Sequence, residues 1–336
     1  TPASAPTEGA SNLGVSGTTA DATWVYTLVT SWGEESAPSP PFSKINIPID
    51  TFDGGTHYIR LNLPSGDPGA PYNLTGGTKR IYRSVASGNA AVYLFSGEVA
   101  ITVTVYDDSV TAANLGEEIP SWRVEDDVVI TWDEPPTATV GMCSHPGQFF
   151  VMWNGKTLTF TEPKYPYASP RAYDVNLDYD IVSAGVVGST IFVATEGVPY
   201  TVAGDHPIAM NIERLPYRQP CMARASFKEV IGGVIYSSPD GLFFLSPGEA
   251  RVYTSEYFRR DQWQVFNPAS IVGEVHDGKY FAWYRTTAGE EASLVFNPVR
   301  PDAAVGRLTS ITGAAFSSIK QDALYVVSGN TLYKWD

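Results

Sequence analysis

The sequence is poor in the side chains that most often carry chemistry. It has four histidines and two cysteines, Cys143 and Cys221, which lie 78 residues apart. Neither cysteine belongs to a CxxC pair or a Cys/His cluster, and no two histidines have the HxH or HExxH spacing of a metal site. We therefore expect no metal and no cofactor. The cysteines are expected to be buried thiols of a protein assembled in a reducing compartment.

Long apolar runs and basic residues are also scarce. No stretch of 18 apolar residues exists and no signal peptide is visible, which predicts a soluble protein without a membrane anchor. The chain has 22 basic and 36 acidic residues, a net charge of −14. Such a surface repels phosphate backbones and offers no footprint for nucleic-acid binding. The acidity has two explanations: it keeps the protein soluble, or it forms a surface along which nucleic acid moves without binding.

Hairpins repeat through the C-terminal two-thirds of the 336-residue chain. Five segments share an apolar strand, a glycine turn and a second apolar or aromatic strand: 148–163, 189–204, 233–248, 279–298 and 323–336. Their turn glycines, Gly155, Gly197, Gly241, Gly289 and Gly329, follow at intervals of 42, 44, 48 and 40 residues. A further short strand precedes each hairpin except the first, and a more polar strand follows. Four short strands per unit predict a β-propeller.

The direct count gives five propeller blades, with four or six as alternatives. A β-sandwich and a β-solenoid are the competing architectures. The last hairpin ends the sequence after its second strand, so we expect residues 127–132 (DVVITW) or the N-terminus to supply the outer strand of that blade. Such closure would remove free sheet edges.

Residues 20–122, in the N-terminal part, have a different sequence pattern from the repeated hairpins. Period-2 alternation predicts strands near 24–28, 44–49, 58–63, 78–83, 91–96 and 101–106, typical of a β-sandwich. The stretches WVYTLVTSWGEESAPS, RIYRS and VYDDS resemble fibronectin type III and related immunoglobulin-like domains, in which such motifs occur in the reverse order. The domain is therefore either permuted or only fibronectin-like. We expect an arm at 1–19, the sandwich at 20–122, a linker at 123–136 and the propeller at 137–336.

No catalytic constellation stands out. The sequence has no GxSxG elbow, no P-loop and no GxGxxG that opens a helix. Propellers often carry glycosidase carboxylate pairs, but any acidic propeller supplies scattered carboxylates. We expect a protein without enzymatic activity.

One loop has an unusual composition. Residues 162–173 (EPKYPYASPRAY) combine aromatic, proline and basic side chains, the kind of rigid amphipathic surface that fills protein interfaces. The alternative is a loop packed over the edge of the propeller itself. The candidate interface residues are Lys164, Tyr165, Pro166, Tyr167, Arg171 and Tyr173.

The propeller half carries a longer resemblance, over roughly residues 140–290. The series FTEPKYPYASPRAYDVNLDYDIV, STIFVATEGVPYTVAGDHP, LPYRQPCMARASF and GGVIYSSPDGLFFLSPG resembles virion proteins of short-tailed bacteriophages, namely tail nozzle or tail hub proteins. The resemblance implies a structural tail protein in the virion, assembled in the cytoplasm of the host bacterium. By analogy, six copies form a ring around the DNA-ejection channel and contact the portal, the adaptor and other tail or fibre proteins. DNA would pass through without specific binding.

Two other functions remain open on the sequence. The first is a carbohydrate-binding or glycan-degrading propeller used for host attachment. The second is a head or tail fibre decoration protein whose fibronectin-like part is adhesive.

Overall fold

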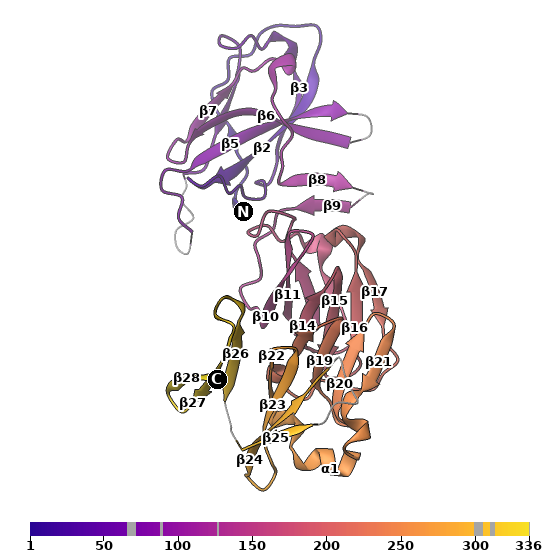
Figure 1. Cartoon of the computed structure of the whole chain (residues 1–336). Coiled ribbons are helices and arrows are strands. Elements are labelled where there is room, and N and C mark those ends of the chain that lie inside the picture. The colour runs from indigo at the N-terminus through magenta and orange to yellow at the C-terminus, as the bar shows by residue number, and fades with distance from the viewer. Residues whose placement is uncertain (66–71, 88–89, 126–127, 299–304, 310–312, 336) are drawn as a thin grey trace. The chain divides into compact units, whose positions relative to one another are not determined.

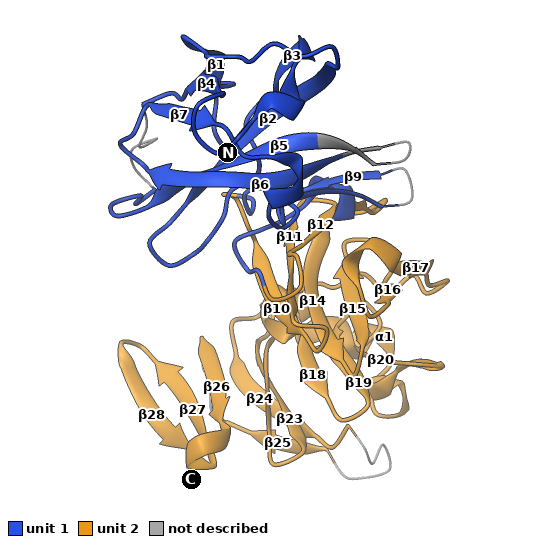
Figure 2. Ribbon diagram, turned by 90° about the horizontal axis from the view of Figure 1, so that it is seen from above, with its two compact units in different colours: residues 1–136, 165–173 blue, residues 137–164, 174–336 orange. Residues whose placement is uncertain are grey.

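The chain is almost entirely β-structure. The computed structural model describes residues 1–65, 72–87, 90–125, 128–298, 305–309 and 313–335 (Figure 1). These residues form antiparallel sheets and a single α-helix, α1, Arg260–Val265. None of the helices in the described ranges is long and apolar enough to cross a membrane. The chain divides into two compact units, unit 1 (1–136 and 165–173) and unit 2 (137–164 and 174–336), coloured separately in Figure 2.

Unit 1 is a β-sandwich of two facing sheets. The smaller sheet has the order β1 (Thr7–Glu8), β4 (Ile59–Asn62), β7 (Val105–Asp108). The larger has the order β3 (Phe42–Ile47), β2 (Ala20–Val29), β5 (Thr78–Ser87), β6 (Ala90–Ala100). The segment 1–19, expected as an arm, therefore contributes a strand to the sandwich.

The core of unit 1 follows from alternation along its strands. Trp24, Tyr26 and Leu28 project from one face of β2, and all three are buried. They share a cluster with Leu61 of β4 and Ile81 of β5, so residues of both sheets meet in one interior. Successive side chains of a strand point to opposite faces, which is why the period-2 pattern located these strands.

A buried charge network joins the two motifs RIYRS and VYDDS. Arg83 on β5 and Asp108 on β7 have no exposed surface, and Nη1 of Arg83 donates to Oδ2 of Asp108 at 2.9 Å. The same carboxylate accepts from the indole of Trp24 at 2.7 Å and from the hydroxyl of Ser96 at 2.7 Å. Nη2 of Arg83 donates to the carbonyl of Val110 at 2.7 Å. The two charges are thus paired, as burial requires, while Nε of Arg83 is buried without a hydrogen-bond partner among the described residues.

The segment 123–136 does not run as an extended linker. β8 (Trp122–Glu125) and β9 (Val128–Thr131) pair as a two-stranded sheet within unit 1. The Trp122 ring packs edge-on against Tyr93, with ring centroids 5.2 Å apart. The prediction that 127–132 closes the last propeller blade is therefore wrong for its described residues, because β9 hydrogen-bonds to β8 instead. The N-terminal strand β1, the other candidate for this outer strand, pairs with β4.

Unit 2 is a propeller of five successive antiparallel sheets, which confirms the predicted fold class. Blades 1 to 4 each have four strands in chain order, and blade 5 has three among its described residues. Their bounds are β10 (Gly141–His145), β11 (Phe149–Asn154), β12 (Thr157–Phe160), β13 (Val175–Asn176); β14 (Ile181–Val187), β15 (Thr190–Thr195), β16 (Tyr200–Ala203), β17 (Asn211–Arg214); β18 (Lys228–Val230), β19 (Gly233–Ser237), β20 (Leu242–Ser246), β21 (Glu249–Val252); β22 (Val272–His276), β23 (Lys279–Arg285), β24 (Glu291–Phe296), β25 (Gly306–Leu308); and β26 (Ala314–Ser318), β27 (Ala323–Ser328), β28 (Thr331–Trp335).

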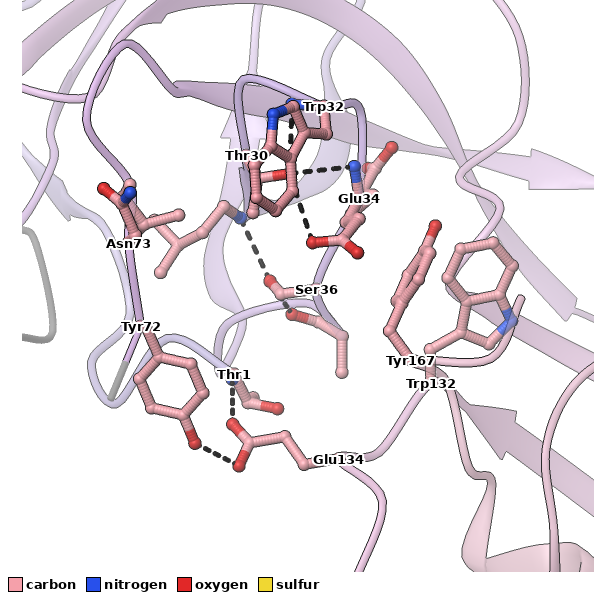
Figure 3. Close-up of a pocket in the computed structure, with 14 residues that line it drawn as sticks. Thr1, Thr30, Trp32, Glu34, Ser36, Tyr72, Asn73, Trp132, Glu134 and Tyr167 are labelled. Atoms are coloured by element: carbon pink, nitrogen blue, oxygen red, sulfur yellow. Dashed lines mark hydrogen bonds and ion pairs between the residues drawn. The ribbon is translucent and has the colours of Figure 1, made fainter. Parts of the chain in front are cut away.

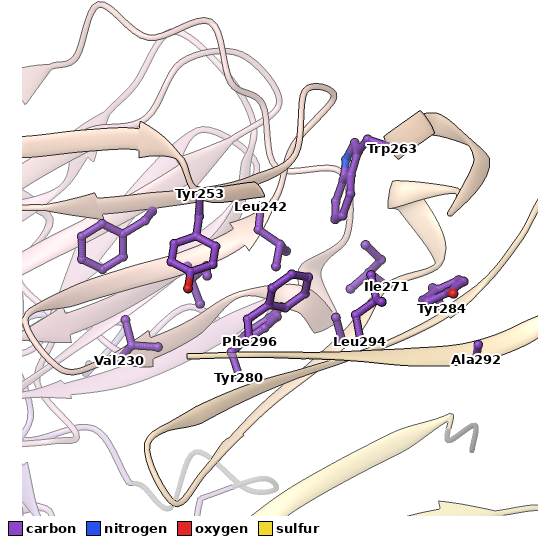
Figure 4. Close-up of a cluster of buried hydrophobic side chains, with 13 residues drawn as sticks. Val230, Leu242, Tyr253, Trp263, Ile271, Tyr280, Tyr284, Ala292, Leu294 and Phe296 are labelled. Atoms are coloured by element: carbon purple, nitrogen blue, oxygen red, sulfur yellow. The ribbon is translucent and has the colours of Figure 1, made fainter. Parts of the chain in front are cut away.

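The first strand of each blade lies beside the first strand of the next, in the succession β10, β14, β18, β22, β26. Hydrophobic clusters join blade 2 to blade 3, blade 3 to blade 4 and blade 4 to blade 5. Blades 3 and 4 share the cluster in Figure 4, in which Leu242 and Tyr280 are fully buried, as is Trp263 of helix α1. Blades 4 and 5 are joined by a smaller cluster that includes Trp283 and Leu324. Each sheet is thus stabilised mainly by its neighbours, as a repeat fold requires.

Each of the five predicted hairpins forms at the expected place, while the first strand of blade 1, β10, had no counterpart among the predictions. Not every one of the turn glycines has the backbone conformation of a tight turn. Gly155 and Gly329 adopt positive φ values of 53° and 59°, as tight turns require. Gly241 is close to extended, with φ at 159°. A Cβ there would lie 2.3 Å from Oγ1 of Thr254, so close packing and not turn geometry requires this glycine.

Candidate functional site

The aromatic loop predicted as an interface packs within unit 1. Tyr165 and Tyr167 both contact Trp132, which follows β9, with ring centroids 4.4 Å and 5.9 Å away. The two tyrosines lie edge to face at 6.0 Å. The backbone amide of Ser169 donates to the carbonyl of Asp133 at 2.7 Å. The loop is therefore held by the segment around Trp132.

The six candidate interface residues differ in exposure. Tyr173 ends a short 3-10 helix, is buried, and accepts a hydrogen bond from Nη2 of Arg123 at 2.8 Å, so its role is structural. Arg171 is exposed, and its guanidinium donates to the carbonyl of Glu134 at 3.3 Å. The remaining exposed members are Lys164, Tyr165 and Pro166, and Tyr167 is half-buried.

A cavity of about 370 Å³ opens in unit 1 beside Tyr167 and Trp132. Figure 3 shows aromatic side chains and carboxylates around it. Its walls come from the turn after β2, the segment 72–74 and the residues after β9. The lining side chains with aromatic or acidic groups are Trp32, Glu34, Glu35, Tyr72, Trp132, Glu134 and Tyr167.

The turn after β2 places Trp32 and Glu34 at this cavity. The amide of Gly33 donates to the carbonyl of Thr30 at 2.9 Å, and Gly33 takes a φ of 84° that favours glycine. The hydroxyl of Thr30 accepts from the amide of Glu34 at 3.1 Å and from that of Trp32 at 3.3 Å. A side chain thus fixes the turn locally, and the Trp32 residue at its tip remains 84% exposed.

The three carboxylates of the cavity have different surroundings. Glu35 is buried and accepts from Thr27 at 2.7 Å, from Tyr82 at 2.6 Å and from Arg80 at 3.0 Å. Its charge is therefore satisfied by the protein itself.

Glu134 and Glu34 are more open. Glu134 accepts a short hydrogen bond from the Tyr72 hydroxyl and lies 3.3 Å from the amino group of Thr1. The bond from Tyr72 holds the pKa of Glu134 below its ordinary value and raises the pKa of Tyr72. Glu34 is half-buried, and within the described residues its carboxylate accepts a single long hydrogen bond, of 3.4 Å, from the Thr30 hydroxyl.

The lowered pKa of Glu134 keeps this carboxylate negatively charged near neutral pH. Aromatic faces with nearby carboxylates can hold an organic cation or the ring of a sugar.

The described residues also contain no group of three or more His, Cys, Asp or Glu side chains arranged to hold a metal ion. His145, for example, is buried, stacks on Phe149 and lies with Nε2 3.1 Å from the carbonyl of Ser189. The cysteines are separate as well: Cys221 is buried and Cys143 is half-buried.

Sequence reasoning selected Tyr167 but missed Trp32, Glu34, Tyr72 and Glu134. A signal existed in the stretches SWGEES and WDEPP, where tryptophan stands beside acidic residues in turn-forming contexts. Their convergence could not be foreseen, because the segments lie about 100 residues apart in the chain.

Comparisons with known proteins identify no family. No protein-family model matches the chain, and no curated protein sequence matches it. Solved structures with a similar backbone include Hsv2 of Kluyvelomyces marxianus, with 9% identity, a TM-score of 0.39, and 76% of this chain and 71% of that chain covered. Another is BBS1N in complex with ARL6DN, with 10% identity, a TM-score of 0.36, and 77% and 86% covered. The AfRom2 CNH domain has 10% identity, a TM-score of 0.34, and 74% and 78% covered.

Proposed function

We propose that the chain is a structural, non-enzymatic virion protein of a bacteriophage tail. In this proposal it forms part of a nozzle or hub ring around the DNA-ejection channel and contacts other tail proteins. The observation that carries the proposal is the ordered series of segments over residues 140–290 that resembles such proteins.

The position of these segments in the fold supports a scaffold role. The stretch STIFVATEGVPYTVAGDHP covers β15 and β16, and GGVIYSSPDGLFFLSPG covers β19 and β20. Their side chains Phe192, Tyr236 and Phe243 are buried in the cluster that joins blades 2 and 3. The resemblance therefore falls on residues that build the propeller, which is expected where shape and assembly are the function.

The negative net charge of the chain is compatible with the lining of a channel through which DNA moves. The net charge of −14 repels a phosphate backbone, and release of counterions cannot drive binding to a surface without clustered lysines and arginines. DNA would pass the ring without being held.

Assembly into a ring requires surfaces for neighbours. Blade 5 exposes several large apolar side chains, Phe316, Ile319, Leu332 and Tyr333. In unit 1 the exposed loop residues Tyr165, Pro166 and Arg171 offer a second, polar and aromatic surface, and Lys164, the residue before them in the chain, belongs to unit 2. We assign these surfaces to contacts with further copies of the chain, six by analogy, and with portal, adaptor or fibre proteins. The fibronectin-like sandwich would act as a spacer or an adhesive module.

Two measurements test this function. Mass photometry and negative-stain microscopy of the purified chain, alone and together with a tail adaptor protein, should reveal a closed ring. Fluorescence anisotropy with labelled duplex DNA at 20–50 mM salt, a range in which phosphate contacts are strongest, should show no appreciable affinity (on the order of 10⁻⁴ M or weaker). Tight DNA binding, or a monomer even with the adaptor, would contradict the proposal.

A carbohydrate-binding or glycan-degrading protein for host attachment is the second candidate. The observation in its favour is the aromatic cavity of unit 1, where Trp32 and Tyr72 expose flat faces of the kind that sugars stack on. A glycan array, with hydrolysis assays on host polysaccharide, tests it. Binding of one glycan class that is lost on Trp32→Ala would favour this function over the ring.

A further inference from the structure

We propose that the cavity of unit 1 is a binding site for an organic cation, an ammonium or guanidinium group that Trp32 and Glu34 recognise together. This site goes beyond the proposed function and does not depend on the ring. The ligand group is the head of a lysine or arginine side chain of a partner protein, or a free amine of the same chemistry.

Size and shape allow such a ligand. A volume of about 370 Å³ lies in the range of small-molecule sites and exceeds the need of one ammonium or guanidinium head. Trp32 is 84% exposed and Tyr72 is 45% exposed, although large aromatic side chains usually bury most of their surface. The fixed turn around Thr30 keeps Trp32 at the mouth of the cavity, so its exposure is built into the local structure.

The charge of the cavity selects a cation. Lysine and arginine are missing from the described residues that line it, whereas three glutamates are present. Glu35 is neutralised by Arg80, and Glu134 lies beside the amino group of Thr1. Glu34 has no ion pair within the described ranges, so its carboxylate is available to a ligand. A cation over an aromatic face and beside a carboxylate gains from the ring quadrupole and from the charge.

The hydrogen-bonding groups argue against a sugar as the preferred ligand. Sugar hydroxyls need both donors and acceptors, but the hydroxyls of this cavity are mostly engaged within the protein. That of Tyr72 donates to Glu134, that of Ser36 donates to the carbonyl of Ala37 at 2.8 Å, and that of Thr30 is used by Glu34. The donors left for a sugar hydroxyl are few, among them the side-chain amide of Asn73 and the indole N–H of Trp132, whereas the carboxylate of Glu34 suits an ammonium or guanidinium group, which only donates.

The test is a titration of the full chain with N-acetyl-arginine amide and N-acetyl-lysine amide, followed by tryptophan fluorescence and isothermal calorimetry. The neutral isostere N-acetyl-citrulline amide and a panel of neutral disaccharides serve as ligand controls. We expect the cations to bind and the isostere to bind at least several-fold more weakly. Trp32→Ala and Glu34→Gln should each weaken cation binding by about 2- to 30-fold, the range of a cation–π contact in partly solvated sites.

Matched variants separate the site from general surface effects. Tyr333→Ala removes an exposed aromatic ring from unit 2, and Glu117→Gln removes an exposed carboxylate from unit 1. Neither should change cation affinity, and circular dichroism should show that all four variants fold. Equal binding of the citrulline probe, preference for a disaccharide, or an equal effect of the control variants would overturn the proposal.

A further titration, with a peptide, identifies the source of the cation. A pentapeptide with one central arginine that binds more tightly than the amide indicates a side chain of a partner protein. Equal affinity indicates a free amine, and both results support the site. The outcome is distinguishable from that of the ring experiment, because the titration needs no assembly.

Discussion

Replacement of Asp108 by asparagine tests the buried network of unit 1. The carboxylate is fully buried and receives hydrogen bonds from Arg83, Trp24 and Ser96. Asp108→Asn keeps the shape of the side chain but leaves the buried guanidinium without its counter-charge. Breaking a buried pair in this way costs about 3–5 kcal/mol of folding free energy, far more than the net contribution of the intact pair.

The neighbouring residue supplies a matched control. Asp107 lies on the same strand and pairs with Arg60 at 2.6 Å, but both side chains are about one-third exposed. Because water solvates this pair and screens it, Asp107→Asn should cost no more than about 1 kcal/mol, although Arg60 holds the carboxylate through both Nε and Nη2. The two variants therefore make the same chemical change one residue apart, on opposite faces of β7.

Hydrogen exchange of the full chain, measured by mass spectrometry, localises the effect to unit 1. Amides of β5 and β7 that exchange through unfolding should exchange about 150 to 5,000 times faster in Asp108→Asn, the same 3–5 kcal/mol expressed as a rate ratio. Amides of the propeller should not change. The double variant Arg83→Met with Asp108→Asn removes the buried charge and should recover part of the loss. Equal small effects of Asp107→Asn and Asp108→Asn would refute the reasoning.

Three further outcomes are expected. Burial raises the pKa of Cys221 and of Cys143 to about 12 each, so both thiols stay protonated at pH 8. Labelling by Ellman's reagent should therefore be slow until guanidinium unfolds the chain, and fast labelling of the native chain at pH 8 would contradict this prediction. The contribution of each thiol to stability is present below pH 9 and is lost as pH rises from 9 towards 12. Gly241→Ala should destabilise the chain by about 1–3 kcal/mol, because the added methyl group overpacks the site. Gly155→Ala has open space around its Cβ and should cost only about 1 kcal/mol, as backbone strain. The denaturation midpoint of Gly241→Ala should therefore be lower than that of Gly155→Ala. Trp263→Ala should cost about 3–5 kcal/mol by emptying the cluster between blades 3 and 4, and calorimetry that finds an unchanged propeller transition would count against that packing.

Local features of the sequence determined most of the strands. The hairpins of the propeller were predictable because an apolar strand, a glycine turn and a second apolar strand are adjacent in the chain and recur at a nearly constant interval. The strands of the sandwich were predictable from alternation, as in Trp24, Tyr26 and Leu28 of β2. Such patterns report the environment of each side chain on its own strand and need no information about distant residues.

Pairing across long sequence separations was decided only by the tertiary structure. Residues 128–131 (VVIT) are as apolar as a propeller strand, yet they pair with β8, because β8 ends only three residues earlier in the sequence and closing a short loop costs little entropy. The aromatic loop around Tyr165 packs on Trp132, about 30 residues earlier in the chain. The cavity brings together Trp32, Tyr72 and Glu134, and no periodicity or spacing in the sequence indicated that these three residues meet. A sequence pattern specifies which faces are apolar, but the choice among distant partners depends on the summed packing of the whole unit.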